Sequence, residues 1–303
     1  GLTHLKFPSL WALRAYHKYY DHRYENRIRT MNTTPYTDDV RLAHTLADSV
    51  DRVAMARFTD HSMSVHMKDD GTPVTDADRE IEQLIRAQLQ RARIRDGVAG
   101  EESGTRGTTS RQWVIDPIDG TSNFVRGVPV WATLIALLDE GEPVVGLVSA
   151  PALQRRWWAA KGSGSYAGKS LARATRFEVS KVANIANSSL SYSDFAGWAE
   201  NGMEQRFFSL AQSVKRTRAY GDFWSYCLVA EGAVDIAADP QLNMHNVAAL
   251  VPIVREAGGK ITTFNGNNAT STTYSQRTSV LATNGALHSK AQGLLSDIGI
   301  SED

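Results

Sequence analysis

The chain has 303 residues, of which 42% are hydrophobic and 22% are charged, as in an ordinary globular protein. Its 33 basic and 33 acidic residues cancel, so no overall field draws it to nucleic acid or to a membrane surface. Its one cysteine, Cys227, excludes an internal disulfide, and no apolar stretch is long enough to span a bilayer, so we expect a cytoplasmic protein with room for two domains.

Residues 1–30 differ from the rest of the chain, because basic side chains are interleaved there with tryptophan and tyrosine. Met31 resembles a natural start, and we expect residues 1–30 to be an added segment or a loosely ordered arm. A basic amphipathic arm that binds a nucleic acid or a membrane is the alternative.

The first half of the chain predicts an α+β pattern. Apolar residues at helical spacing predict a helix over residues 40–53, which Thr37 and Asp38 are expected to cap. A second helix is predicted over residues 76–93. The predicted strands are residues 112–115, 132–138, 144–149 and 156–160, and the glycine-rich segment 161–168 is expected to form a hairpin and connector.

The second half alternates helices and strands, which favours an α/β layer. The predicted helices are residues 207–214, 222–233, 247–257 and 286–295. The predicted strands are residues 234–237, 260–264 and 279–283. The change of pattern near residues 179–187 predicts two domains, an N-terminal one over 31–180 with a metal site and a C-terminal one over 181–303 with substrate-selecting residues.

The most informative run is WVIDPIDGTSNF at residues 113–124. A hydrophobic strand ends at Asp116, and Pro117 disfavours helical geometry there, so we expect Asp116 and Asp119 to lie on a turn. Gly120 then begins a helix whose free N–H groups can bind phosphate, while the two carboxylates can hold a divalent cation. A turn followed by a capped helix is the alternative for any part of the run, but the whole run predicts metal-dependent phosphate chemistry.

The run also resembles a signature of the inositol monophosphatase family, which comprises Mg²⁺-dependent phosphatases of small phosphate monoesters. Further motifs similar to those of the family occur on both sides of this run, in the family's order. They are PVTDAD at 73–78, GEES at 100–103, HNVAAL at 245–250 and EAGG at 256–259. The resemblance runs from about residue 40 to the C-terminus. It implies a layered αβαβα sandwich of the inositol monophosphatase and fructose-1,6-bisphosphatase type, and a homodimer.

The resemblance assigns metal ligands to Glu101, Asp116, the carbonyl of Ile118, Asp119 and position 246. It implies two or three Mg²⁺ ions and attack on the phosphate by a water that a cation activates. No covalent enzyme intermediate is expected.

Two residues would act directly on that water, and a third would act through one of them. Glu101 and Thr121 would orient and deprotonate it, with Asp78 as the partner of Thr121. For Glu101 alone a solvated loop acid is the alternative, because Glu102 is adjacent, and Asp78 also suits the first turn of a helix.

Asn246 departs from the family pattern, which has aspartate at this position. An amide has one carbonyl oxygen and no charge, so a cation bound there loses an electrostatic partner. Natural variation, a register shift that makes His245 the relevant group, and a deliberate substitution that traps substrate are three competing explanations.

Substrate selection is predicted from RAYGDFWSY at residues 218–226. Asp222 suits a cationic or imidazole-bearing substrate better than a neutral polyol, although a helix N-cap is the alternative for this residue. This run, together with residues 124–131 and 151–158, closely resembles the histidinol-phosphate phosphatases of the family. The implied substrate contacts are Asp119, Gly120, Thr121, Arg218, Asp222, Asp239 and Asn246.

The resemblance thus implies hydrolysis of L-histidinol phosphate to L-histidinol and phosphate, a step of histidine biosynthesis. The partner is a small phosphomonoester, with no nucleic acid and no membrane. Hydrolysis of inositol-1-phosphate or another small phosphomonoester is one alternative. A catalytically impaired form that binds ligand without turnover, because of Asn246, is the other.

Overall fold

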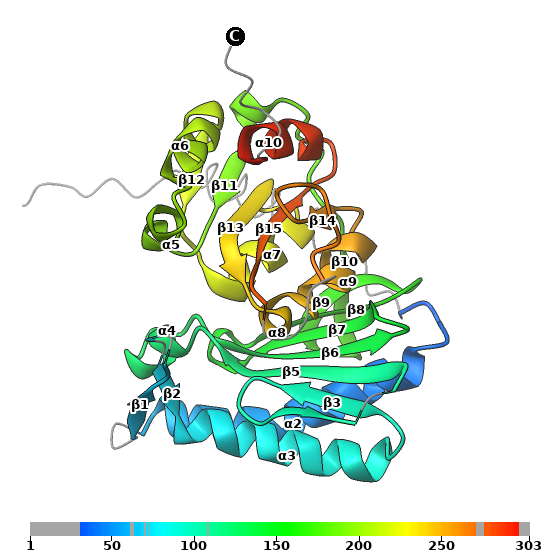
Figure 1. Cartoon of the computed structure of the whole chain (residues 1–303). Coiled ribbons are helices and arrows are strands. Elements are labelled where there is room, and N and C mark those ends of the chain that lie inside the picture. The colour runs from blue at the N-terminus through cyan, green and yellow to red at the C-terminus, as the bar shows by residue number, and fades with distance from the viewer. Residues whose placement is uncertain are drawn as a thin grey trace, which may run out of the picture.

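The computed structural model describes residues 31–60, 64–69, 71, 73–107, 109–270 and 276–296, and Figure 1 labels its elements. Residues 1–30, for which we predict an added segment or an arm, lie outside the described residues. Two large sheets alternate with three layers of helices, which confirms the αβαβα sandwich (Figure 1). None of the helices in the described part of the chain has the length and apolar character needed to cross a bilayer.

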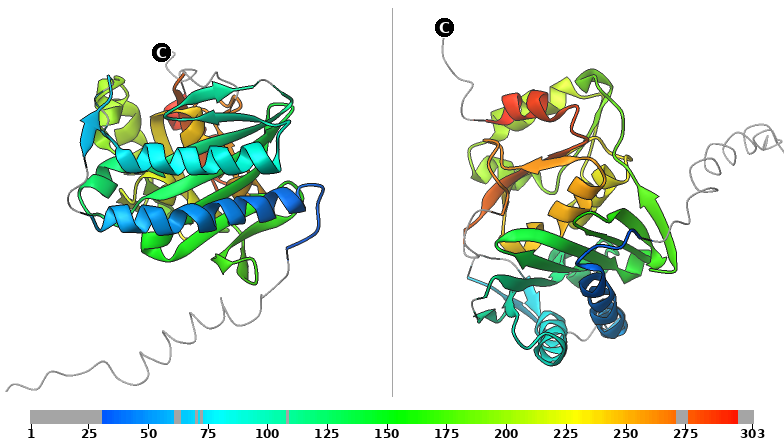
Figure 2. Two further views of the ribbon diagram at one scale, coloured as in Figure 1. Left: turned by 90° about the horizontal axis from the view of Figure 1, so that it is seen from below. Right: turned by 90° about the vertical axis from the view of Figure 1, so that its right-hand side faces the viewer.

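The first helical layer consists of α2 (Thr37–Phe58) and α3 (Asp76–Ala92), which lie side by side across one face of the larger sheet (Figure 2, left). Both helices confirm the sequence pattern. The predicted cap on α2 is wrong, because Thr37 is already helical and its hydroxyl donates to the carbonyl of Thr34 at 2.9 Å. A short hairpin, β1 (Val65–Met67) and β2 (Pro73–Thr75), connects the two helices.

The larger sheet has eight strands in the order β10-β9-β8-β7-β6-β5-β3-β4, and only β3 and β5 pair in parallel. Its strands are β3 (Gly97–Gly100), β4 (Gly104–Arg106), β5 (Arg111–Asp119), β6 (Ala132–Asp139), β7 (Glu142–Ala150), β8 (Arg155–Ala160), β9 (Gly164–Ser170) and β10 (Arg173–Phe177). Side chains alternate between its faces: Trp113 and Ile115 pack toward α2 and α3, and Val114 packs on the opposite face. The prediction for 161–168 is right about the hairpin and wrong about the connector, because β9 begins at Gly164.

The strand β5 carries the two predicted metal-binding acids, and the prediction that they lie on a turn is wrong. β5 continues through Asp119, with a shift of pairing register between Asp116 and Asp119. Pro117 lies in this irregular stretch, where a residue without an N–H is tolerated, and its carbonyl accepts the hydroxyl of Thr133 at 2.8 Å. The bulge therefore keeps both acids on a rigid strand.

The middle helical layer consists of α7 (Asp222–Ala230), α8 (Met244–Val247) and α9 (Leu250–Glu256), which lie between the two sheets (Figure 1). The helix predicted over 247–257 corresponds to α9, and α8, which ends at Val247, was not predicted. The smaller sheet follows the order β12-β11-β13-β15-β14. Its strands are β11 (Ser189–Ser191), β12 (Arg216–Arg218), β13 (Ile236–Leu242), β14 (Lys260–Thr262) and β15 (Thr278–Thr283).

The outer helical layer covers the far face of the smaller sheet. It contains α5 (Phe195–Glu200), α6 (Glu204–Ser213) and α10 (His288–Leu295). The described residues also form two 3₁₀ turns, η1 (Pro151–Leu153) and η2 (Ile185–Asn187). On β13, Ile236 and Ala238 pack toward this layer, whereas Ala237 packs toward the middle layer. Each sheet therefore buries both faces.

One hydrophobic core joins the two sheets through the middle layer. It includes Val148 of β7, Val251 of α9 and Ala282 of β15. The change from the larger to the smaller sheet falls between Phe177 and Ser189, in the region of the predicted domain boundary. The division into two domains stays a prediction, because this shared core belongs to both.

Candidate active site

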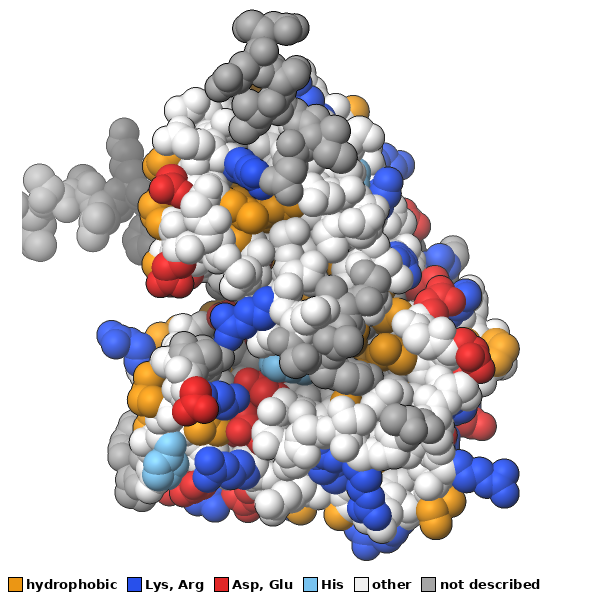
Figure 3. All heavy atoms as spheres, in the orientation of Figure 1, with side chains coloured by type: hydrophobic (Ala, Val, Ile, Leu, Met, Phe, Trp, Pro, Cys, Tyr) orange, Lys and Arg blue, Asp and Glu red, His pale blue; other side chains and the backbone are white. Residues whose placement is uncertain are grey.

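A cavity of about 260 Å³ opens between the larger sheet and the middle helical layer. Figure 3 shows acidic side chains gathered at a hollow between the lower and upper parts of the molecule. Most of the predicted site residues line the cavity, namely Glu101, Asp116, Ile118, Asp119, Gly120, Thr121, Asp222 and Asn246. Asp78, Arg218 and Asp239 are not among the residues that line it.

Asp116 and Asp119, both on β5, are almost fully buried at the base of this cavity. Burial raises the pKa of both carboxyls well above the ordinary value, and the charges of Glu101 next to Asp116 and of Asp222 next to Asp119 add to the effect. No hydrogen-bond donor among the described residues reaches Oδ1 of Asp116. Converging carboxylates with a free buried oxygen are a donor set that fits a divalent cation.

Glu101 follows β3 directly, and a buried acid holds the loop that carries it. Glu82 of α3 accepts the backbone N–H of Glu102 at 2.7 Å and that of Ser103 at 3.0 Å. A side chain at Gly100 would collide with the Glu82 carboxylate, so this loop requires glycine there.

Lys68, at the end of β1, also binds the Glu101 loop. Its Nζ lies 2.7 Å from Oε1 of Glu101 and 2.6 Å from Oε1 of Glu102. Burial alone would raise the pKa of Glu101, but the opposing effects of His245 and Lys68 hold this pKa below its usual value.

Thr121 begins the short helix α4 (Thr121–Val125) and lies beside Asp78. Its hydroxyl is 2.8 Å from the carbonyl of Ile118 and 3.4 Å from Oδ1 of Asp78. Oδ2 of Asp78 accepts both the backbone N–H and the hydroxyl of Thr75 at 2.7 Å. Burial raises the pKa of Asp78 to about 6. Asp78 therefore caps α3 and contacts Thr121 at the same time. The helix-start interpretation is confirmed, and the catalytic role stays a prediction.

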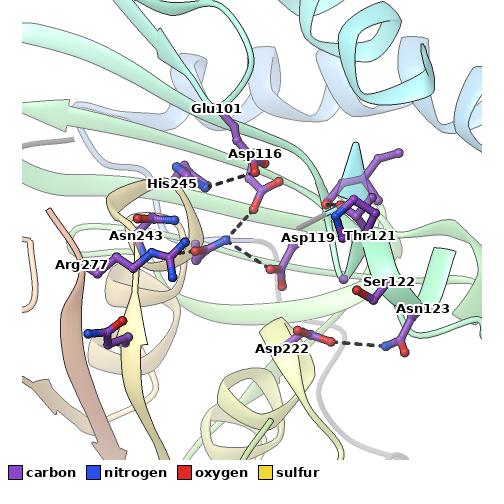
Figure 4. A pocket seen from close by; sticks show the side chains of 15 residues that line it. Glu101, Asp116, Asp119, Thr121, Ser122, Asn123, Asp222, Asn243, His245 and Arg277 are labelled. Atoms are coloured by element: carbon purple, nitrogen blue, oxygen red, sulfur yellow. Dashed lines mark hydrogen bonds and ion pairs between the residues drawn. The ribbon is translucent and has the colours of Figure 1, made fainter. Parts of the chain in front are cut away.

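Asn246, on α8, contacts the two acids of β5, Asp116 and Asp119, which Figure 4 labels. Its Nδ2 donates to Oδ2 of Asp116 at 2.9 Å and to Oδ1 of Asp119 at 3.3 Å. Its Oδ1 accepts the backbone N–H of Asn243 at 3.1 Å. The amide thus presents a donor to the carboxylates, and its one oxygen caps the helix.

Asp222 is the first residue of α7 and lies next to Gly120. Its Oδ2 is 3.4 Å from the position that a Cβ on Gly120 would occupy. Asn123 donates to the same Oδ2 at 3.3 Å. The N-cap interpretation of Asp222 is wrong, because Gly221 occupies the cap position and no side chain caps this helix. Burial raises the pKa of Asp222 to about 6, which shows how strongly this site disfavours an unpaired negative charge.

The remaining predicted substrate contacts lie elsewhere. Asp239 is buried below α7, where it accepts the hydroxyl of Tyr226 at 2.8 Å and the backbone N–H of Ser193 at 2.9 Å. Arg218 ends the edge strand β12 and is exposed. Their assignment as substrate contacts stays a prediction.

Sequence reasoning missed several residues of the cavity. Asn123 appears in the sequence only as a helix-start residue. Lys68, which carries no motif of its own, does not line the cavity but contacts Glu101. Arg277 and Asn243 also line the cavity, from segments that are far from the acidic motifs in sequence. Among these residues, only His245 could be suspected from the sequence, because it is next to Asn246.

The αβαβα sandwich and its acidic cavity define a layered phosphohydrolase. Residues 36–299 match the model of the inositol monophosphatase family, and the chain belongs to that family. It is 55% identical over 252 residues to a histidinol-phosphatase of Mycobacterium tuberculosis, covering 83% of this chain and 95% of the relative. A histidinol-phosphatase of Streptomyces coelicolor is 52% identical over 264 residues, with 86% and 97% covered.

A solved structure agrees with this assignment. An inositol monophosphatase from Zymomonas mobilis superposes with a TM-score of 0.76 at 31% identity, covering 87% of this chain and 99% of that one. The family membership makes this chain a phosphoric monoester hydrolase of a metal-dependent family.

Proposed function

We propose that this chain hydrolyses histidinol phosphate to histidinol and phosphate. The observation that carries the proposal is the position of the Asp222 carboxylate, which lines the same cavity as Asp116 and Asp119. Histidinol phosphate carries an amine and an imidazole beside its phosphate, so one end of it is cationic and the other anionic. The curated relatives that are 52–55% identical are named histidinol-phosphatase.

The cation that we propose for this function is Mg²⁺. Glu101, Asp116, Asp119 and the carbonyl of Ile118 would hold it, and a second or third ion would depend partly on Asn246. When bound, Mg²⁺ supplies the positive charge that stabilises the developing charge on the phosphoryl oxygens.

The chain's own residues would position the water and the phosphate. The Thr121 hydroxyl donates to the Ile118 carbonyl or to Asp78, so the lone pairs of Oγ1 would be free to accept a hydrogen bond from the attacking water. The lowered pKa of Glu101 keeps its carboxylate ionised, so it would accept the other hydrogen of that water and take up the proton during the attack. The backbone N–H groups of Gly120 and Thr121 would donate to phosphate oxygens at the start of α4.

Asp222 would then select the substrate by pairing with its cationic end, and Asn123 would hold this carboxylate in place. Because the carboxylate is largely buried, a neutral polyol offers it no compensating charge. We further propose that the protein acts as a cytoplasmic homodimer on this small phosphomonoester.

The test compares phosphate release by the full chain from histidinol phosphate and from inositol-1-phosphate at saturating Mg²⁺. A charge-assisted contact contributes about 1.5–3 kcal/mol, so kcat/KM for histidinol phosphate should be higher by about tenfold or more. Equal or reversed kcat/KM values would overturn the substrate assignment and leave phosphatase activity in place.

A second candidate function is a ligand-binding form with impaired turnover. Asn246 favours it, because its amide donates to the two carboxylates that would otherwise share a second cation. Absence of phosphate release from any small monoester in excess Mg²⁺, with histidinol phosphate still bound in a calorimetric titration, would support this candidate.

A further inference from the structure

A histidine lies against the acidic cluster. Glu101, Asp116 and His245 each offer one ligand atom, and these three atoms all lie within 4.8 Å of one another. Nε2 of His245 is 3.6 Å from Oε1 of Glu101, and the His245 side chain is 13% exposed. Two ligands about 2.1 Å from one cation at a tetrahedral angle lie about 3.4 Å apart, so this spacing is that of two ligands of a single ion.

The two oxygens of Asp116 face different partners. Oδ2 accepts the amide of Asn246, whereas the buried Oδ1 has no donor among the described residues. Figure 4 shows His245, Glu101 and Asp116 converging on one side of the cavity. The amide of Asn246 donates to both Asp116 and Asp119. The amide therefore occupies the side shared by the two aspartates and leaves the histidine side for an ion.

We propose that Glu101, Asp116 and His245 bind a single transition-metal dication, Zn²⁺ more tightly than Mn²⁺ and both more tightly than Mg²⁺. Imidazole nitrogen is a common ligand of Zn²⁺ and of other transition metals, whereas Mg²⁺ prefers oxygen ligands alone. Use of this ion in catalysis rests on the proposed phosphatase function, but its binding does not.

Lys68 is the competing cation at this position, because its ammonium group contacts Oε1 of Glu101. It also contacts Glu102, so it retains an acidic partner when Glu101 turns to a metal ion. The exchange therefore leaves no buried ammonium group without a partner.

The test uses the metal-stripped full chain and titrates it with Mn²⁺, which electron paramagnetic resonance detects directly. Pulsed measurements should show coupling of bound Mn²⁺ to an imidazole nitrogen in the wild type. The coupling should disappear in His245→Gln and persist in His66→Gln, a matched control on the exposed strand β1. Zn²⁺, measured by displacement of Mn²⁺, should bind at least about tenfold more weakly to His245→Gln, while Mg²⁺ affinity stays unchanged.

Absence of nitrogen coupling in the wild type, or unchanged Zn²⁺ affinity in His245→Gln, would overturn the proposal. If His245→Gln fails to fold, wild-type protein labelled with ¹⁵N-histidine decides, because a nitrogen ligand must change the coupling pattern. Phosphate release with Mg²⁺ is assayed separately. Turnover without nitrogen coupling contradicts this inference alone, and nitrogen coupling without turnover contradicts only the phosphatase function.

Discussion

Asp116 illustrates how a single residue can serve function at the expense of stability. Burial and the charges of Glu101 and Asp119 raise its pKa, so ionisation of this carboxyl in the folded, metal-free protein costs free energy. We expect Asp116→Asn to abolish phosphate release and to raise the unfolding temperature of the metal-free protein at pH 8. Since the pKa of Asp116 is higher in the folded than in the unfolded chain, the stability gain of the variant should vanish below about pH 4. There the wild-type carboxyl is neutral in both states.

Thermal unfolding of both proteins between pH 4 and pH 8, without metal, checks this expectation. Normal turnover in the variant would remove Asp116 from the metal site. A stability gain that did not grow with pH would instead contradict the assigned pKa shift.

The charge of Asp222 should act on substrate choice. Asp222→Asn keeps an oxygen for Asn123 and tolerates the left-handed backbone at this residue, where φ is 51°. We expect KM for histidinol phosphate to rise by about ten- to a hundredfold, from loss of a contact of about 1.5–3 kcal/mol. Hydrolysis of a small neutral phosphomonoester should change little. Equal losses on both substrates would show that Asp222 supports the chemistry or the fold instead.

Asn246→Asp should raise activity by replacing a donor with an acceptor between Asp116 and Asp119. A third carboxylate there repels the other two until a cation binds, so the variant should require Mg²⁺ to reach its full stability and activity. A Mg²⁺ titration of phosphate release should give a higher plateau for the variant than for the wild type. Identical titration curves would indicate that position 246 is not a metal ligand in this chain.

Among the elements, the turn from β5 into α4 sets the geometry of the site. Gly120 has φ of 83°, and a Cβ there would lie 2.8 Å from the carbonyl oxygen of Val130. We expect Gly120→Ala to lower both the unfolding temperature and kcat/KM. Gly127→Ala is the matched control, because Gly127 has φ of 73° and a Cβ there would meet no atom within 4 Å. This variant therefore introduces only the backbone strain, about 1–2 kcal/mol. Equal effects of both variants on phosphate release would contradict a positioning role for this turn.

The long elements could be predicted because their patterns are long. The apolar face of α3 and the alternating strand β6 repeat often enough to identify the element type. Strands of three or four residues, such as β2, β3 and β11, contain too few residues for a pattern and form only because neighbouring strands pair with them. The bulge at Pro117 was missed for a related reason, since proline predicts a break in isolation and a bulge only beside β6.

The residues of the site also differ in how far the sequence predicts them. Asp116, Asp119, Gly120 and Thr121 are adjacent in sequence, so one motif predicted them together. The contact of Lys68 with Glu101 spans 33 residues and depends on how the β1–β2 hairpin packs against α3 and α4. Asp239 was assigned only through the family resemblance, and the fold gives it Tyr226 and Ser193 as partners.

Across the whole molecule, the middle helical layer links the two sheets through one hydrophobic core, so we expect the sheets to unfold together. Gly146 of β7 shows how close this packing is, because a side chain there would collide with the carbonyl of Ala249 just before α9. We expect Gly146→Ala to lower the free energy of unfolding by about 3 kcal/mol or more, in a single unfolding transition. Gly293→Ala is the control, since nothing lies within 4 Å of that position. Two separate transitions in chemical denaturation would show that the predicted domains unfold independently.

The single cysteine lies within that same middle layer. Cys227 is fully buried on α7, and burial raises the pKa of its thiol well above the ordinary value, so it is inert while the layer stays closed. A thiol-specific reagent therefore reacts only with molecules in which α7 has separated from the sheets. The rate of labelling measures how often this happens under native conditions, and its slowing by added metal and substrate analogue would report ligand binding without any engineered probe.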